Sequence, residues 1–226
     1  MNRPVIRAFV QARMSSARFP GKVLAPFNGK PVIAHVIAEV KRVLPTERVV
    51  VTTSTESSDD PLACYVRQLG ISVFRGSLDH VVERFQKCLK EYPCTWFFRI
   101  CADSPLLDSA LLQTMMTYGD RSDIDLVTNI YPRTFPTGRS LEMLYATTFG
   151  GLNSGRLSEE EKEHVTKVYY DHPKEFRIIN LRSADPLLAE TALAIDTIED
   201  LRRLERWVQD NPSLAEGAPS VAGKRL

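Results

Sequence analysis

The sequence predicts an α/β fold built on a largely parallel sheet, and three observations support this prediction. Short apolar runs rich in β-branched residues alternate with segments of helical period between residues 5 and 128. The helical segments supply the long crossovers that parallel strands require. A chain of 226 residues with 43% hydrophobic residues can bury one core of ordinary size. We therefore expect a single domain whose sheet is covered by helices on both faces.

The first half of the chain repeats strand and helix in order. Pro31 opens a helix on which Ile33, Ile37 and Val40 share one face, and Gly70 ends another helix. The expected strands are 5–10, 48–53, 71–74, 96–101 and 125–128. The expected helices are 31–43, 61–69, 78–89 and 108–118.

The regular alternation of strand and helix ends after Asn129, where prolines and a glycine interrupt the pattern. We expect an antiparallel strand at 140–145, a helix at 158–170, strands at 176–181 and 191–195, and a helix at 197–208. Glu199 and Asp200 suit the N-terminal turn of that last helix. Residues 211–226 lack periodicity and are predicted to form a disordered tail, so the folded domain is expected at 1–210.

Positive charge is concentrated at the start of the chain. The first 38 residues contain six of the 29 Lys and Arg residues and none of the 28 Asp and Glu residues. Arg13, Arg18 and Lys22 lie in a loop of small residues that directly follows the strand at 5–10. Ligands bind at this edge of open α/β sheets, and such cations with backbone N–H groups can surround a polyphosphate. The alternative is a solvated loop. The loop has neither the G-x-x-x-x-G-K-[ST] nor the G-x-G-x-x-G phosphate signature.

The composition argues against several other partners and sites. The net charge is +1 and the chain has no second basic stripe, so we expect no binding to nucleic acid. No run of 18 apolar residues or signal peptide is seen, so we expect no membrane association. The four cysteines show no C-x-x-C spacing, which favours reduced thiols, a cytoplasmic protein and no zinc site. A small anion is the expected partner.

Two aspartates follow predicted strands at the same edge as the cationic loop. Asp103 comes just after the strand at 96–101 and is followed by Pro105, while Asp196 comes just after 191–195. Each aspartate alone is common as a helix N-cap or a turn residue. Together, beside a phosphate-binding loop, they suit Mg²⁺, which takes one or two carboxylates and completes its shell with water and substrate phosphates.

The sequence contains the motifs Gln11-Ala-Arg-x-x-Ser-x-Arg-x-Pro-Gly-Lys22, Gly29-Lys-Pro31, Thr52-Thr-Ser54, Val73-Phe-Arg-Gly76, Arg99-x-x-x-Asp103-x-Pro105, Phe135-Pro-x-Gly138, Glu142, Glu163-His-Val-Thr166 and Asp196-Thr-x-Glu-Asp200. Their order resembles that of the cytidylyltransferases, over about residues 5 to 208. The chain is similar to their spore-coat-polysaccharide branch, which is related to the acylneuraminate and 3-deoxy-manno-octulosonate enzymes. The resemblance implies a GT-A-like, Rossmann-like nucleotide-diphospho-sugar transferase fold, a three-layer sandwich with a mostly parallel mixed sheet. It also implies that residues 1–130 form a nucleotide-binding half and residues 131–210 a sugar-binding half.

The resemblance implies transfer of CMP from CTP to an acidic sugar, with Mg²⁺ as cofactor and pyrophosphate as the second product. Arg13, Lys22 and Asp103 would be the catalytic residues, and Asp103 and Asp196 would hold the metal. No protein nucleophile is needed, so Cys101 and Ser104 are interpreted as structural. The implied nucleotide-binding residues are Gln11, Ala12, Arg13, Arg18, Lys22, Thr52, Ser54, Arg75, Gly76 and Arg99. The resemblance implies that the nucleobase pocket is lined by residues 52–54, Thr53 included, and by the Arg75-Gly76 turn. The implied sugar-binding residues are Arg133, Arg139, Glu142 and His164.

Several alternatives stay open at this point. Arg75 can line the base pocket or form a surface ion pair, Arg99 can contact ligand or pair with an internal aspartate, and His164 can be a structural hydrogen-bonding residue. The chain departs from the family pattern at 139–141 and at Lys167, which leaves the acceptor sugar undetermined. One alternative function is a nucleotidyltransferase that uses another nucleotide or a polyol or sugar-phosphate acceptor. Another is a catalytically inactive module that binds a nucleotide sugar. A homodimer is a further possibility for its partners.

Overall fold

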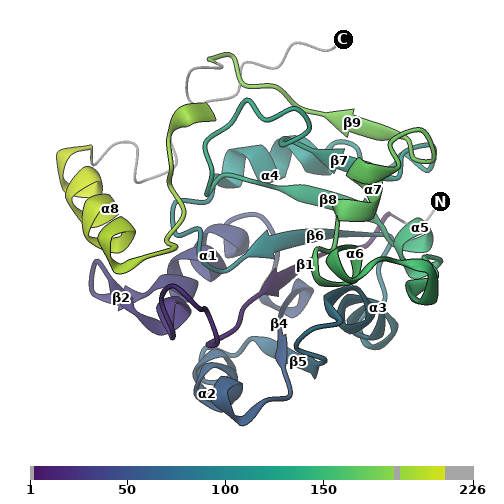
Figure 1. Cartoon of the computed structure of the whole chain (residues 1–226). Coiled ribbons are helices and arrows are strands. Elements are labelled where there is room, and N and C mark those ends of the chain that lie inside the picture. The colour runs from purple at the N-terminus through teal and green to yellow at the C-terminus, as the bar shows by residue number, and fades with distance from the viewer. Residues whose placement is uncertain (1–2, 186–188, 212–226) are drawn as a thin grey trace.

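The computed structural model describes residues 3–185 and 189–211 and contains one seven-stranded sheet (Figure 1). The strand order is β5-β4-β1-β6-β8-β7-β9. Strand β8 runs antiparallel to β6 and β7, whereas the other neighbouring pairs are parallel. The mostly parallel α/β sheet of one domain is therefore confirmed. The strands are β1 (Ile6–Gln11), β4 (Val49–Ser54), β5 (Ser72–Gly76), β6 (Trp96–Cys101), β7 (Leu126–Thr128), β8 (Glu142–Tyr145) and β9 (Ile178–Asn180).

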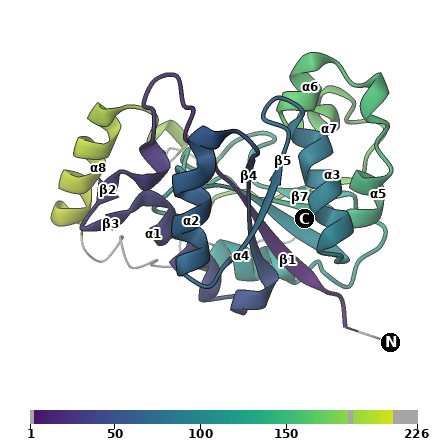
Figure 2. The ribbon, with the colours of Figure 1, turned by 90° about the horizontal axis from the view of Figure 1, so that it is seen from below.

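Helices cover both faces of this sheet, as Figure 2 shows. Side chains alternate along β1, so Ala8 and Val10 enter the core on one face, while Phe9 enters the core on the other and stacks on Phe97. The first core is closed by α1 (Val32–Lys41), α2 (Asp60–Gln68) and α4 (Ser109–Met116). The second is closed by α3 (Val81–Glu91), α5 (Ala146–Gly150) and α7 (Lys167–Asp171), while α6 (Glu159–Glu163) packs beside α3.

A third apolar cluster joins the last helix to a small hairpin. Leu201 and Leu204 of α8 (Ile198–Asp210) share this cluster with Phe27 of the hairpin between β2 (Pro26–Phe27) and β3 (Lys30–Pro31). The sequence analysis missed the hairpin, although its turn is Asn28-Gly29 with positive φ angles of 45° and 80°. Short 3-10 helices complete the fold at η1 (Lys22–Leu24), η2 (Thr46–Arg48), η3 (Ser57–Asp59) and η4 (Ser154–Arg156).

Two of the predicted elements were wrong. The helix expected at 158–170 is interrupted between α6 and α7, where extended backbone at His164 turns Val165 into the second core. The strand expected at 191–195 makes only one isolated bridge, between Ala192 and Thr137, because its neighbour is a loop rather than a strand. Most of the predicted tail, residues 212–226, lies outside the described residues.

Candidate active site

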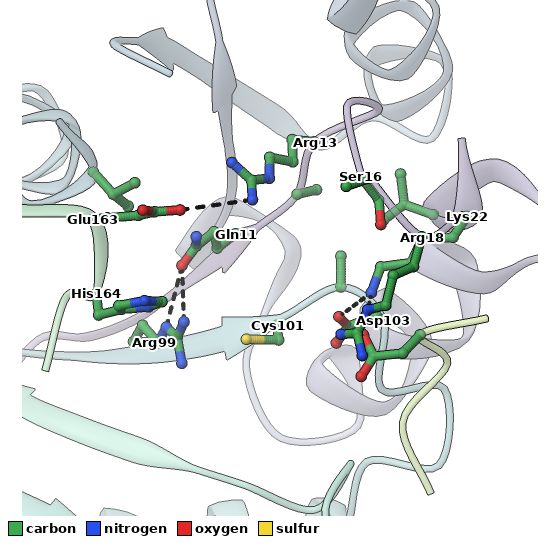
Figure 3. A pocket seen from close by; sticks show the side chains of 16 residues that line it. Gln11, Arg13, Ser16, Arg18, Lys22, Arg99, Cys101, Asp103, Glu163 and His164 are labelled. Carbon is green, nitrogen blue, oxygen red and sulfur yellow. Dashed lines mark hydrogen bonds and ion pairs between the residues drawn. The ribbon is translucent and has the colours of Figure 1, made fainter. Parts of the chain in front are cut away.

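Three parallel strands end together at one edge of the sheet. Gln11 at the end of β1 lies opposite Thr52 of β4 and Cys101 of β6. Backbone hydrogen bonds from Ala12 to Thr52 and from Ala102 to Gln11 extend this alignment by one residue. A cavity of about 360 Å³ lies over this edge (Figure 3). It is lined by Gln11, Ala12, Arg13, Ser16, Ala17, Arg18, Lys22, Val23, Val81, Arg99, Cys101, Ala102, Asp103, Glu163, His164 and Asp196.

Asp59 fixes the cationic loop, 12–21, to the end of β4. Its buried carboxylate accepts hydrogen bonds from the Met14 N–H at 2.7 Å and from the backbone and hydroxyl of Ser54. Burial alone would raise the pKa of Asp59, but these hydrogen bonds outweigh it and hold the pKa below its usual value. Gly21, at φ 76°, closes the loop by donating to Met14 O at 2.8 Å, so Lys22 starts η1 beside the cavity. Sequence reasoning missed Asp59, whose position before α2 is that of an ordinary helix cap.

A close backbone approach brings Asp196 to Asp103. The Ile195 N–H donates to Asp103 O at 2.9 Å, and the Leu193 N–H donates to Thr137 O at 2.8 Å. Gly138 makes this approach possible, because its φ is 89° and a Cβ there would lie 2.4 Å from the Leu193 carbonyl carbon. The glycine of the Phe135-Pro-x-Gly138 motif therefore positions the second aspartate.

Lys22 lies between these two aspartates. Its Nζ is 2.7 Å from Asp103 Oδ2 and 2.9 Å from Asp196 Oδ1. Burial alone would lower the pKa of Lys22, but the charges and hydrogen bonds of the two carboxylates outweigh it and raise the pKa. Arg18 reaches Asp196 Oδ1 at 3.0 Å from the exposed side. The structure thus joins four predicted site residues from distant parts of the chain.

The donor set at this position fits a divalent cation bound together with a polyphosphate. Among residues 3–185 and 189–211, no cluster of three or more His, Cys, Asp or Glu side chains could hold a metal by itself. Asp103 and Asp196 are close enough to share one cation, which Lys22 demonstrates. Two carboxylates completed by water and phosphate oxygens form a common Mg²⁺ environment.

Arg99 forms the floor of the cavity between Gln11 and Glu142. Its guanidinium donates to Gln11 Oε1 at 3.1 and 3.2 Å and to Glu142 Oε2 at 3.2 Å. The other oxygen of the buried Glu142 accepts from the Tyr170 hydroxyl at 2.6 Å. The internal partner of Arg99 is therefore a glutamate rather than the aspartate expected, while Arg99 still lines the cavity. Tyr170 has no signal in the sequence motifs.

Helix α6 brings Glu163 and His164 to the mouth of the cavity. The Arg13 Nη2 lies 3.9 Å from Glu163 Oε1, and both side chains are about half exposed (Figure 3). Exposed ion pairs of this kind contribute little, so Arg13 can exchange this partner for a ligand anion. Glu163 belongs to the Glu163-His-Val-Thr166 motif, but sequence reasoning singled out only His164.

The residues predicted to read the nucleobase lie outside the cavity lining. The hydroxyls of Thr53 and Ser54 donate to Asp59, so they help to hold the loop. Arg75 pairs with Asp60 at 2.6 Å, which is the ion-pair alternative. The remaining two also lie inside the protein framework: Thr52 is fully buried, and Gly76 packs against Arg84.

Only one of the four predicted sugar-binding residues, His164, lines the cavity. Arg139 is buried with its Nη1 3.9 Å from Asp108 Oδ2, so its side chain supports the loop before β8. Arg133 is half-buried and donates to Ser140 Oγ at 2.8 Å. The fourth, Glu142, lies beneath Arg99.

The thiol and hydroxyl next to Asp103 are poor nucleophiles. Burial raises the pKa of Cys101 to about 11, with Arg99 offsetting part of the shift, so the thiol is protonated at neutral pH. The Ser104 hydroxyl donates to Asp103 Oδ1 at 3.3 Å, and this carboxylate is a weak base because its other oxygen is paired with Lys22. This supports the structural interpretation of both residues. The four cysteines are free thiols.

The cavity is suited to a phosphate-bearing ligand. Four cations line it against three carboxylates, at the carboxyl edge where open α/β sheets bind ligands. An α/β sheet that brings a cationic loop and an aspartate pair together at its carboxyl edge fits a protein that binds nucleotide phosphates. None of the helices in the described residues is long and apolar enough to cross a membrane.

The chain belongs to the cytidylyltransferase family, whose model matches residues 7–149. The spore coat polysaccharide biosynthesis protein SpsF of Bacillus subtilis (strain 168) is 29% identical over 225 residues, covering 96% of this chain and 90% of the relative. A cytidylyltransferase structure from Leptospira borgpetersenii has a TM-score of 0.83 and 27% identity over 96% of this chain and 98% of the other. A CMP:2-keto-3-deoxy-manno-octonic acid synthetase complexed with CTP shares the fold, with a TM-score of 0.70, 16% identity, and coverage of 91% and 99%.

Proposed function

We propose that this cytidylyltransferase transfers CMP from CTP to an acidic sugar of the ulosonic or sialic-acid type, in the cytoplasm, for surface polysaccharide or glycan biosynthesis. The observation that carries the proposal is the cluster of Lys22, Arg18, Asp103 and Asp196 at the carboxyl edge of the sheet. Two similar proteins support it, since one is a spore coat polysaccharide biosynthesis protein and the other is a synthetase complexed with CTP.

The cationic loop would hold the triphosphate. Transfer at phosphorus depends on positioning and charge neutralisation more than on covalent help from the protein. Arg13, Arg18 and Lys22 supply these charges, and the Asp59 hydrogen bonds keep their loop in place. The sugar hydroxyl oxygen forms a bond to the α-phosphorus, the bond from this phosphorus to pyrophosphate breaks, and the hydroxyl proton passes to solvent.

Asp103 and Asp196 would hold Mg²⁺ in the loaded enzyme. The bound metal would neutralise developing charge on the phosphate oxygens. The Ile195–Asp103 backbone hydrogen bond and Gly138 keep the two carboxylates at one position, so they are prepared for a shared cation.

Residues 1–130 would bind the nucleotide, and residues 131–210 would complete the sugar side. His164 enters the cavity from this second part, and Glu142 orients Arg99 from below. A carboxylate on the acceptor requires a guanidinium, for which Arg99 and the half-buried Arg133 are the candidates.

A thermal-shift panel of the four nucleoside triphosphates, with and without Mg²⁺, tests the nucleotide assignment. We expect CTP with Mg²⁺ to raise the unfolding temperature most, because at equal concentration the nucleotide with the lowest Kd stabilises the native state most. At 100 times its Kd, a ligand adds about 2.7 kcal/mol to the free energy of unfolding. The Lys22→Ala variant serves as the control and should lose most of this shift. Equal stabilisation by all four nucleotides would rule out a preference for CTP.

A further inference from the structure

We infer that Lys22 occupies the cation position between Asp103 and Asp196 in the nucleotide-free protein, so that a divalent metal enters only together with a polyphosphate. The inference rests on the metal site of the proposed function and adds an order of binding to it. Its basis is a pair of short contacts, 2.7 and 2.9 Å, that join one ammonium nitrogen to both carboxylates.

The negative charges of Asp103 and Asp196 are balanced without a metal. The Lys22 side chain is only 10% exposed, and Arg18 approaches Asp196 at 3.0 Å from the solvent side. Two cations therefore balance two carboxylates within one cluster. A divalent ion entering alone would have to displace the ammonium and meet its repulsion at short range. We therefore expect the free protein to bind divalent metals weakly.

A polyphosphate changes this balance because it supplies new acceptors for the cations. The ammonium of lysine is carried on a flexible stem and can redirect its three donors, so Lys22 can leave the aspartates for a phosphate oxygen. The backbones that carry the aspartates stay together, because the Ile195–Asp103 hydrogen bond and the close approach at Gly138 join them. The vacated carboxylates then accept the metal. By linkage, metal and polyphosphate each strengthen the binding of the other by the same factor.

The test measures Mn²⁺ binding to the full chain without nucleotide, by the electron paramagnetic resonance signal of the free ion. We expect weak binding in the wild type and binding about tenfold tighter in Lys22→Met, since one charge-assisted contact to each carboxylate is removed. Lys22→Arg retains the charge and should bind as weakly as wild type. Adding inorganic triphosphate to the wild type should raise the amount of Mn²⁺ retained with the protein in equilibrium dialysis about tenfold or more, after subtraction of the Mn²⁺ that triphosphate binds in a protein-free control.

Two controls assign any gain to this cluster. The Lys30→Met variant removes a charge from the exposed hairpin outside the cavity and should leave Mn²⁺ affinity unchanged. The double variant Lys22→Met with Asp103→Asn should lose the gain, because one ligand is missing. Arg18→Met, at an exposed side chain, provides a second single variant and should give a smaller gain in the same direction.

The inference is overturned if Mn²⁺ affinity in Lys22→Met stays within about twofold of wild type, or if wild type without polyphosphate already binds as tightly as Lys22→Met. Should Lys22→Met fail to fold, the same twofold criterion applies to Arg18→Met. Failure of the proposed function has a different signature. If Asp103→Asn retains Mg²⁺-dependent turnover with CTP, the metal site itself is wrong. If turnover is lost but Lys22→Met gains no metal affinity, only the order of binding is wrong.

Discussion

Replacing Asp103 with asparagine is expected to lower Mg²⁺-dependent pyrophosphate release from CTP by about 10²–10³-fold or more. Asparagine preserves the size of the side chain and can still accept a hydrogen bond from Lys22, so the fold should be retained. It removes the charge that the aspartate pair needs for a divalent cation. Asp196→Asn should behave in the same way, because both carboxylates contact the same ammonium. A coupled pyrophosphate assay with saturating CTP measures the effect.

Asp123→Asn is a matched control for these two variants. Asp123 is an exposed aspartate that pairs with Arg121 and does not line the cavity, so its replacement should leave turnover unchanged. Thermal unfolding of all three variants separates lost chemistry from lost structure. Turnover near the wild-type level in Asp103→Asn or Asp196→Asn would show that the changed residue is not a metal ligand.

Loss of Lys22 or Arg13 is expected to lower CTP affinity and rate together. A charge-assisted hydrogen bond contributes about 1.5–3 kcal/mol, which corresponds to one to two decades in binding. Lys22→Ala should show the larger loss, because its side chain is 10% exposed, whereas that of Arg13 is 43% exposed. Calorimetry with CTP and the coupled pyrophosphate assay measure the two quantities.

Lys30→Ala is the control for these cationic variants. It removes a charge from the same acid-free segment of the chain, but at an exposed residue outside the cavity. Its affinity and rate should match the wild type. Changes below about twofold in both Lys22→Ala and Arg13→Ala would show that the concentration of charge in the first 38 residues has no role in nucleotide binding.

The sequence predicted the sheet and its active edge because both depend on local patterns. Apolar runs and helical periods identify the repeating strand–helix units, and the residues that follow β1 and β6 must emerge at the same edge. This reasoning located the cationic loop and Asp103 without any long-range contact. It also predicted the antiparallel strand that became β8.

The partners of several predicted site residues could not be predicted, because they depend on long-range contacts that sequence patterns do not contain. Lys22 pairs with Asp103 and Asp196, which are separated from it by 81 and 174 positions in the sequence. The absence of acidic residues near Lys22 in the sequence therefore did not mean that its charge is unbalanced. Arg75 pairs with Asp60, and the Thr53 and Ser54 hydroxyls donate to Asp59, so all three side chains have partners within the protein. A side chain that could bind a ligand can also bind such a partner within the protein, and only the folded structure shows which partners are within reach.

The most direct test of the central claim is identification of the reaction product by mass spectrometry. The protein is incubated with Mg²⁺, each nucleoside triphosphate in turn, and a panel of 2-keto acidic sugars, sugar phosphates and polyol phosphates. We predict a CMP-linked acidic sugar, formed with an equal amount of pyrophosphate, from CTP and an acidic sugar. Nucleotidyl transfer that proceeds equally well from another nucleotide, or that occurs with phosphorylated acceptors while every acidic sugar stays unmodified, would contradict the claim.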